Sequence, residues 1–258
     1  LDENGTIRSN LLSSSLPAAG SGSSNGGFSG GLDGFSGFDA LGTQNGSFIS
    51  GANFYENIAA QTQGFTPSNL TTLDGGAAYS EALDLLANQD EYDINLLMLP
   101  GLVHSLHTSV LNKAIDTCEN RGDCFAIIDP VAYGKNPSHA VTQAESKDSN
   151  FAAMYYPWVK VLDSQIAGTQ RWVPPSVVLG GIYAFNDRVA HPWFAPAGLN
   201  RGGITTAIQA ERKLTQGNRD TLYDSNINPI ATFPGQGVTV FGQKTLQKKA
   251  SALDRINV

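Results

Sequence analysis

The chain has 258 residues, of which 41% are apolar and 15% are charged, and this is enough apolar sequence to bury one full core. Its net charge of −7 argues against sequence-independent nucleic-acid binding, because such proteins neutralise phosphates with a basic face. No stretch approaches the roughly 18 uncharged apolar residues needed to span a bilayer, and the N-terminus has neither the basic nor the apolar region of a signal peptide. We therefore expect no membrane insertion and no secretion, and the first residue, Leu1, indicates a piece of a longer polypeptide.

Charge is distributed unevenly along the chain. Residues 1–100 carry eleven Asp and Glu against one basic residue, Arg8, for a net charge of −10, whereas residues 101–258 carry fifteen Lys and Arg against twelve Asp and Glu, for a net charge of +3. This asymmetry suits head-to-tail packing of identical subunits, in which the acidic part of one copy contacts the basic part of the next. An accident of where the fragment begins and ends explains it equally well.

Residues 1–51 contain twelve Gly and eleven Ser. Their apolar residues are too sparse and irregular to build a helix or a sheet face. We predict that this Gly/Ser-rich segment is flexible. In the alternative interpretation, the spaced aromatic side chains of Phe28, Phe35 and Phe38 pin a glycine loop onto a neighbouring surface.

From residue 53 the pattern changes to alternating helix and strand signals. Residues 77–88 have apolar side chains at helical spacing. The continuous apolar run 94–100 is typical of a strand buried on both faces. The apolar stripe over 105–121 predicts a helix that stops before Gly122, the usual left-handed position after a helix end.

The same alternation is then repeated. The short apolar run 125–130 predicts a strand, residues 139–147 predict a helix, and the apolar segment 152–162 follows. Strict alternation of strands and helices implies right-handed crossovers. We therefore predict an α/β fold with a largely parallel or mixed sheet flanked by helices on both faces.

The pattern changes again after residue 172. The run Pro174-Pro175-Ser176 predicts extended backbone before a Ser N-cap, and residues 177–190 continue as a helix in which Gly180 and Gly181 allow a neighbouring element to approach closely. The paired glycines cost roughly 1 kcal/mol each relative to Ala, so close packing must offset them.

The end of the chain contains three further predicted segments: a proline-punctuated loop over 191–203, a short helix and its exit over 214–230, and an alternating strand over 237–246. We divide the chain into three parts: a Gly/Ser-rich segment (1–52), an α/β core domain (53–200) and the start of a C-terminal domain (201–258).

Few residues are arranged for chemistry. Cys118 and Cys124 are too few for a disulfide scaffold and lack zinc-knuckle spacing, so we expect reduced structural thiols. His104 and His107 could share a helical face, but a metal site needs a third ligand, which favours a capping or surface pair. Asp129 ends a predicted strand, where α/β enzymes place reactive carboxylates, although an Asp-Pro pair there is more commonly a turn initiator.

Other motifs give no better support for an enzyme. The pattern G-x-S-x-G at residues 22–26 lies inside Gly/Ser-rich sequence, without the flanking strand and helix of a nucleophile elbow. Neither a phosphate-binding P-loop nor a dinucleotide-binding glycine motif is present. The sequons at Asn4, Asn45 and Asn69 mean little without a secretory signal. We predict no catalytic residues, no cofactor and no metal.

Seven segments occur in a consistent order over roughly 165 residues: NLLMLPG (95–101), YYPWVKV (155–161), WVPPSVVLGGIYAFND (172–187), HPWFAPAGLNRGGI (191–204), LT…RDTLYDSNINPI (214–230), FPGQGVTVFGQKTL (233–246) and SALDRINV (251–258). Together they resemble the tail sheath proteins of contractile-tailed bacteriophages. The resemblance implies a structural subunit that stacks as hexameric rings around the tail tube and contracts to drive the tube through the host envelope for genome ejection.

The resemblance also implies partners and a location. The partners are other copies of the chain, the tail tube protein, and the baseplate and tail terminator proteins, within a virion tail assembled in the host cytoplasm. Family chains continue beyond the segment that resembles DRINV into a C-terminal arm that contacts the tube and exchanges strands with neighbours. We therefore expect this chain to be truncated before the arm and to be a monomer in solution.

Two sets of charged residues are candidates for these contacts. The first set is acidic and would approach Lys or Arg of another subunit: Glu81, Asp84, Asp90, Glu91 and Asp93. The second set is basic and would face the tail tube, or would form a solvated strand end: Lys244, Lys248, Lys249 and Arg255.

Two other classes of protein compete with the sheath subunit. An enzyme or small-ligand binder on a doubly wound sheet would have its site beyond Pro100 and Asp129, at the carboxyl ends of the strands, and polar residues would converge there in a pocket. A passive adhesin or capsid-like shell protein would share the low charge and the Gly/Ser segment, but it does not explain the segments over 172–258.

Overall fold

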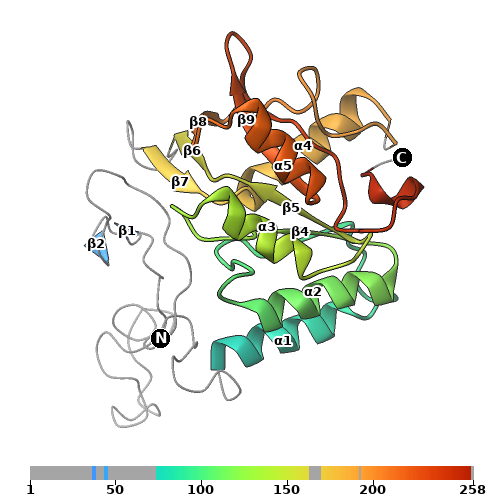
Figure 1. Cartoon of the computed structure of the whole chain (residues 1–258). Helices are drawn as coiled ribbons and strands as arrows, with labels where there is room; N and C mark the ends of the chain where they lie inside the picture. Colours follow the sequence, from blue (N-terminus) through green and yellow to red (C-terminus); the bar gives the residue numbers. More distant parts are fainter. Residues whose placement is uncertain (1–36, 39–43, 46–73, 163–169, 192, 257–258) are drawn as a thin grey trace, which may run out of the picture. The chain divides into compact units, whose positions relative to one another are not determined.

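The computed structural model describes residues 37–38, 44–45, 74–162, 170–191 and 193–256 (Figure 1). The chain divides into two compact units, Leu1–Asp33 and Gly34–Val258, and all described residues belong to the second. The G-x-S-x-G pattern, the sequons at Asn4 and Asn69, and Phe28 and Phe35 lie outside the described residues. Phe38 and Asn45 lie in a short antiparallel pair of strands, β1 (Gly37–Phe38) and β2 (Gln44–Asn45).

A five-stranded sheet forms the centre of the second unit, and its strand order is β10-β9-β5-β4-β3. Four strands are parallel and one, β10, is antiparallel. This arrangement confirms the predicted largely parallel α/β sheet. The strands are β3 (Leu96–Met98), β4 (Phe125–Ile128), β5 (Ala152–Tyr156), β9 (Ile227–Phe233) and β10 (Gly237–Val240).

Four helices pack on one face of this sheet: α1 (Asp74–Leu86), α2 (Thr108–Arg121), α3 (Pro137–Glu145) and α5 (Gln216–Asp224) (Figure 1). Each strand contributes side chains to the clusters on both faces of the sheet, because successive side chains of a strand point to opposite faces. Ala126 and Ile128 of β4 join the cluster beneath these helices, whereas Ile127 between them joins the cluster on the other face.

The other face is covered by α4 (Ser176–Val189) and by a three-stranded antiparallel sheet. That sheet has the order β7-β6-β8, with β7 (Gln170–Val173), β6 (Val159–Leu162) and β8 (Ala207–Ala210). A short 3₁₀ helix, η2 (Ala252–Asp254), follows near the end. Among the described helices, none is long and apolar enough to cross a membrane.

Several local predictions hold. Helix α2 ends at Arg121, and Gly122 follows with φ of 74°, donating its backbone N–H to the Cys118 carbonyl at 2.8 Å. At Gly180 a Cβ atom would lie 3.0 Å from Met98 Cε, so the predicted close approach is real there. At Gly181 it is not, because nothing lies within 4 Å of the corresponding position.

Other predictions need correction. Strand β3 lies at the sheet edge, so only Leu97 of its three residues is buried. Residues 152–162 form two strands in two different sheets. The predicted exit from the helix in 214–230 is in fact the start of β9, inside the large sheet, and the predicted strand over 237–246 ends at Val240. The proposed division of the chain at residues 52 and 200 stays a prediction.

Candidate protein-interaction surfaces

Acidic side chains gather on α1 and on the loop that joins it to β3. All five acidic residues predicted to lie at a subunit interface are exposed: Glu81, Asp84, Asp90, Glu91 and Asp93. Asp84 accepts a 2.6 Å hydrogen bond from Lys113 of α2. Asp84 and Asp90 also line one surface hollow together with Asp116. The structure therefore places Asp84 and Asp90 at one hollow and leaves the other three exposed on the same helix and loop, and the role of all five at a subunit interface stays a prediction.

A buried arginine holds in place the loop between α1 and β3, residues 87–95, which we call the acidic loop. Arg121, at the end of α2, donates from Nη2 to the Tyr92 carbonyl at 2.8 Å and from Nη1 to the Leu86 carbonyl, and Gln89 Nε2 donates to the Arg121 carbonyl. Its guanidinium also forms two hydrogen bonds with Asp123, which lower the pKa of that carboxyl. The sequence analysis missed this residue, because its partners lie about thirty positions away in the chain.

The predicted tube-facing residues lie in two separate places on the protein. Lys244 and Arg255 both lie over the ring of Tyr223 in α5, at 4.5 and 5.8 Å from its centroid. Burial lowers the pKa of Lys244, and the nearby positive charge of Arg255 lowers it further. Lys248 is exposed and donates from Nζ to the Glu145 carbonyl at the end of α3, and Lys249 is also exposed.

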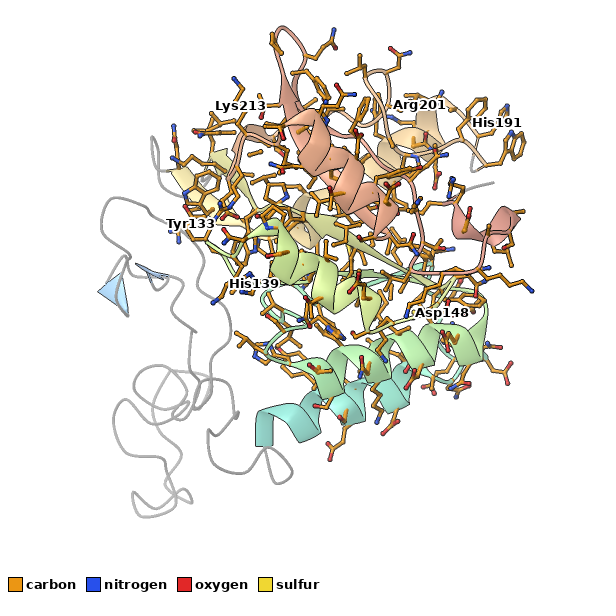
Figure 2. The ribbon with its side chains drawn as sticks, in the orientation of Figure 1. Tyr133, His139, Asp148, His191, Arg201 and Lys213 are labelled. Atoms are coloured by element: carbon orange, nitrogen blue, oxygen red, sulfur yellow. The ribbon has the colours of Figure 1, made fainter. Side chains whose placement is uncertain are left out.

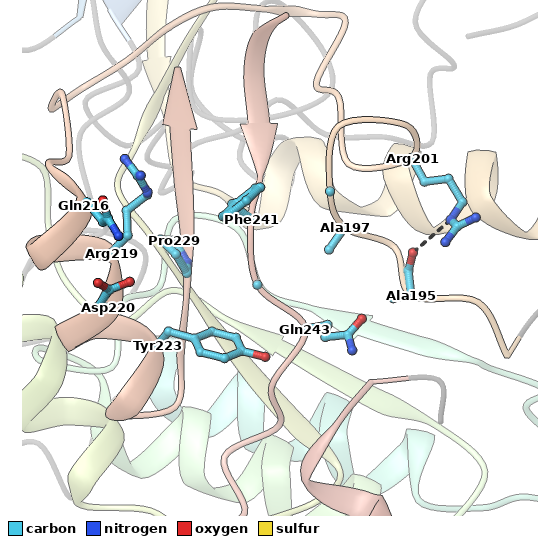
Figure 3. A pocket seen from close by; sticks show the side chains of 12 residues that line it. Ala195, Ala197, Arg201, Gln216, Arg219, Asp220, Tyr223, Pro229, Phe241 and Gln243 are labelled. Carbon is cyan, nitrogen blue, oxygen red and sulfur yellow. Dashed lines mark hydrogen bonds between the residues drawn. The ribbon is translucent and has the colours of Figure 1, made fainter. Parts of the chain in front are cut away.

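Next to Tyr223 lies a cleft of about 510 Å³ between α5, the loop 195–201 and the segment 241–243 (Figure 3). Figure 3 shows Arg219 and Asp220 on the α5 side and Arg201 on the opposite side. Arg201 donates from Nε to the Ala195 carbonyl at 3.3 Å, and Arg219 donates from Nη1 to the Leu214 carbonyl at 3.0 Å. Two arginine side chains thus line a space that can accommodate a ligand segment, and the Arg219 guanidinium also lies over the ring of Phe233 at 5.4 Å.

Exposed aromatic side chains lie close to this cleft. His191 and Trp193 stack with ring centroids 4.4 Å apart, and Trp193 is 65% exposed. Phe194 lies under the guanidinium of Arg201 at 4.6 Å, and Figure 2 shows Arg201 and His191 on the same side of the unit. Aromatic and arginine side chains are the types that most often dominate protein interfaces, so this region suits contact with another protein.

The carboxyl end of β4 is filled rather than open. Asp129 is buried and accepts hydrogen bonds from the backbone N–H and the hydroxyl of Ser176, at 3.0 and 2.5 Å. Burial raises the pKa of Asp129 to about 7. The structure therefore gives Asp129 the task of holding the first turn of α4, and it is neither a free catalytic carboxylate nor a simple turn initiator.

The two histidines do not form a surface pair as predicted. Both are buried: the ring nitrogens of His104 are bonded to Gln143 at 2.8 Å and Asn112 at 3.0 Å, and His107 Nδ1 accepts from the Val103 backbone N–H at 3.1 Å. His107 occupies the N-cap position of α2, but its side chain does not bond the helix backbone there. Both ring nitrogens of His104 are thus bonded to amide side chains.

The cysteines are buried free thiols, as predicted, and their sulfur atoms lie 3.1 Å apart. Within the described ranges, no group of three or more His, Cys, Asp or Glu side chains could hold a metal ion.

The fold is that of a contractile sheath protein. The chain superposes on the solved helical sheath of the anti-feeding prophage in its contracted state with a TM-score of 0.54 and 25% sequence identity, covering 75% of this chain and 49% of that one. The model of the phage tail sheath protein central domain matches residues 75–246. The chain belongs to the phage tail sheath protein family.

Curated relatives agree with this assignment. The tail sheath protein of Vibrio phage KVP40 is 30% identical over 83% of this chain, and that of Enterobacteria phage T4 is 30% identical over 82%. The match spans 37% and 36% of the lengths of those two proteins. The chain therefore corresponds to little more than a third of each relative.

Proposed function

We propose that the chain is part of a structural subunit of a contractile phage tail sheath. In this role the subunit stacks as hexameric rings around the tail tube and contracts to drive the tube through the host envelope, so that the genome is ejected. The observation that carries the proposal is the match of the sheath central domain to residues 75–246. The likeness to a sheath in the contracted state supports it.

The proposal extends to partners and location. The partners are further copies of the same subunit, the tail tube protein, the baseplate and the tail terminator. The subunit is assembled in the host cytoplasm and becomes part of the virion. Tail sheath proteins of two other phages, with which the chain shares 30% identity, support this assignment.

The work of such a subunit is mechanical and not enzymatic. Contraction requires a subunit that keeps its fold while its contacts with neighbours change. The packed strand ends support this reading, because Asp129 is bonded to Ser176 and the Trp158 indole donates to the Val131 carbonyl at 2.9 Å. A small-ligand site at those ends, the alternative considered for a doubly wound sheet, has less support for the same reason.

The two charged sets take different roles in the proposal. The acidic set on α1 and its following loop contacts basic residues of a neighbouring subunit, and exposed carboxylates suit an interface that must change its pairing during contraction. The basic set near the end of the chain, Lys244, Lys248, Lys249 and Arg255, faces the tail tube. Exposure of Lys248 and Lys249 is compatible with that contact.

Electron microscopy of the intact protein expressed alone tests the main proposal. Hollow helical polymers of sheath width support it. Turnover of a metabolite by the protein, or failure to polymerise under every condition tried, overturns it.

Cross-linking in assembled tails tests the tube-facing set. An amine-reactive cross-linker is expected to join Lys248 or Lys249 to the tube protein, whereas the exposed Lys135, which precedes α3, serves as the control. Equal cross-linking from Lys135 and from the basic set contradicts the assignment.

A further inference from the structure

The Arg201 and Arg219 cleft and the acidic loop lie at opposite edges of the large sheet. Helix α5 packs against β9, and the segment 241–243 directly follows the edge strand β10. The acidic loop leads into β3, the strand at the other edge, and α1 packs against α2. Because the two surfaces are separated by the width of the sheet, one copy can use both at once with two different neighbours.

The acidic loop carries exposed negative charge. Lys113 and Arg121 of α2 line the same hollow as Asp90, but Lys113 pairs with Asp84 and Arg121 pairs with Asp123. Residues 74–112 contain no Lys or Arg, and Asp90 and Glu91 are exposed at the loop. The hydrogen bonds from Arg121 to the Leu86 and Tyr92 carbonyls hold the start and the middle of the loop. A loop that is already held in one conformation loses little entropy on binding, which favours recognition by a partner.

The cleft has the complementary character. Of its three charged lining residues, Arg201 and Arg219 are basic and Asp220 is acidic. Lys244 and Arg255 lie over the ring of Tyr223 but do not line the cleft, so its excess of positive charge comes from the two arginines alone. Arginine is the residue best suited to hold carboxylates, since its planar guanidinium can form two parallel hydrogen bonds with one carboxylate.

We propose that the acidic loop of one copy, at Asp90 and Glu91, occupies the Arg201 and Arg219 cleft of a second copy. The inference rests on the proposed sheath function and adds to it the surface that receives the acidic residues. Because the two surfaces differ, the contact is heterologous, and repeating it produces an open chain of subunits rather than a closed dimer.

Disulfide trapping tests the contact directly. The test uses the intact protein, because this chain alone is expected to be a monomer. One variant carries Asp90→Cys on the loop and Gln243→Cys in the cleft, and the native Cys118 and Cys124 are buried and do not interfere. Oxidation with copper phenanthroline is expected to join loop to cleft between copies and to give a ladder of covalent multimers on a non-reducing gel. The control combines Gln243→Cys with Ser138→Cys on the exposed surface of α3, and no ladder is expected from it.

The trapping result separates this contact from the sheath proposal. Polymers in the microscope without a ladder above the control overturn the contact and leave the sheath proposal intact. A ladder without polymers supports the contact and counts against the sheath. Absence of both overturns both proposals.

Charge exchange provides the second test, in the same trapping background. Glu91→Arg or Arg219→Glu alone is expected to lower the ladder yield about tenfold, because each change places two like charges at the proposed contact. The two changes together are expected to recover most of the yield. The exposed Lys213→Glu has the same change in charge as Arg219→Glu outside the cleft and is expected to leave the yield unchanged. Equal yields from Arg219→Glu and Lys213→Glu overturn the proposal.

Discussion

The backbone N–H and the hydroxyl of Ser176 both donate to the Asp129 carboxyl group, so a residue just past the end of β4 holds the first turn of α4. The two residues are 47 positions apart in the chain. Unbonded N–H groups at a helix N-terminus need acceptors, and a carboxylate there also interacts favourably with the helix dipole. The contact thus connects the large sheet to the helix on its second face.

The buried position of Asp129 makes stability depend on pH. Burial raises the pKa of this carboxyl from 3.8 to about 7, so between these values the folded protein binds a proton that the unfolded chain has released. The contribution of Asp129 to stability is therefore full below pH 3.8 and is lost as the pH rises through 7. Between pH 5 and pH 7 we expect the free energy of unfolding to fall by about 2 kcal/mol more in the native protein than in Asp129→Asn.

Urea unfolding of both proteins at several pH values measures this difference, and parallel curves contradict the prediction. Ser176→Ala provides a further check. Because the hydrogen bonds from Ser176 lower the pKa of Asp129, their partial loss is expected to move the pH-dependent range upward.

The paired glycines of α4 are predicted to respond differently to the same substitution. Gly181→Ala places a methyl group in open space and is expected to stabilise the protein by about 0.5–1 kcal/mol, through the better helix propensity of Ala. Gly180→Ala places it 3.0 Å from the flexible end of Met98, so the gain is expected to be smaller or absent. Denaturant unfolding compares the two variants, and equal stabilisation contradicts the predicted packing.

Local signals in the sequence predicted the elements that depend on neighbouring residues. One example is the end of α2, since Gly122 has the positive φ that is needed just after a helix. A second example is the buried strand β4, which the short apolar run 125–130 predicted. Such signals did not predict β9. Its residues Asn228 and Pro229 are typical of a turn, and they fit a strand only because tertiary bonds satisfy the asparagine.

Of the two candidate surfaces, one was predictable from neighbouring residues in the sequence and the other was not. The acidic loop was visible in the sequence, since Asp90, Glu91 and Asp93 are close together in the chain. The cleft was not, because Arg201, Arg219 and the segment 241–243 meet only after the chain has folded. The role of Arg121 was missed for the same reason: its hydrogen bonds reach carbonyl groups in a loop that precedes it by about thirty residues.

The two cysteines are predicted to be unreactive in the folded protein. Burial raises the pKa of Cys118, mainly because the surroundings disfavour the charged thiolate, and the thiolate is the reactive form. A chromogenic disulfide reagent is expected to react with neither thiol under native conditions and with both after denaturation. Reaction of one thiol in the folded protein at the rate of free cysteine contradicts this expectation.

Asn228 is predicted to be essential for the attachment of the segment after β10. Its side chain is fully buried, and Oδ1 accepts from the Lys244 backbone N–H at 2.7 Å while Nδ2 donates to the Lys244 carbonyl at 2.8 Å. Asn228→Ala leaves these backbone groups without their partner and is expected to lower the free energy of unfolding by about 2–3 kcal/mol. Asn228→Asp is expected to be destabilising as well, because a carboxylate cannot donate to the carbonyl.

The same contact explains why residue 242 is glycine. A Cβ atom at Gly242 would lie 2.8 Å from Asn228 Oδ1 and 2.9 Å from Asn228 Cα, so Gly242→Ala must displace backbone or break the bonds to Lys244. Because both substitutions damage one contact, the double variant is expected to lose less stability than the two single variants combined. Urea unfolding measures all three, with the exposed Asn120→Ala as a control that is expected to change stability by less than about 0.5 kcal/mol. Strict additivity would show that Gly242 and Asn228 act independently and would contradict the predicted coupling.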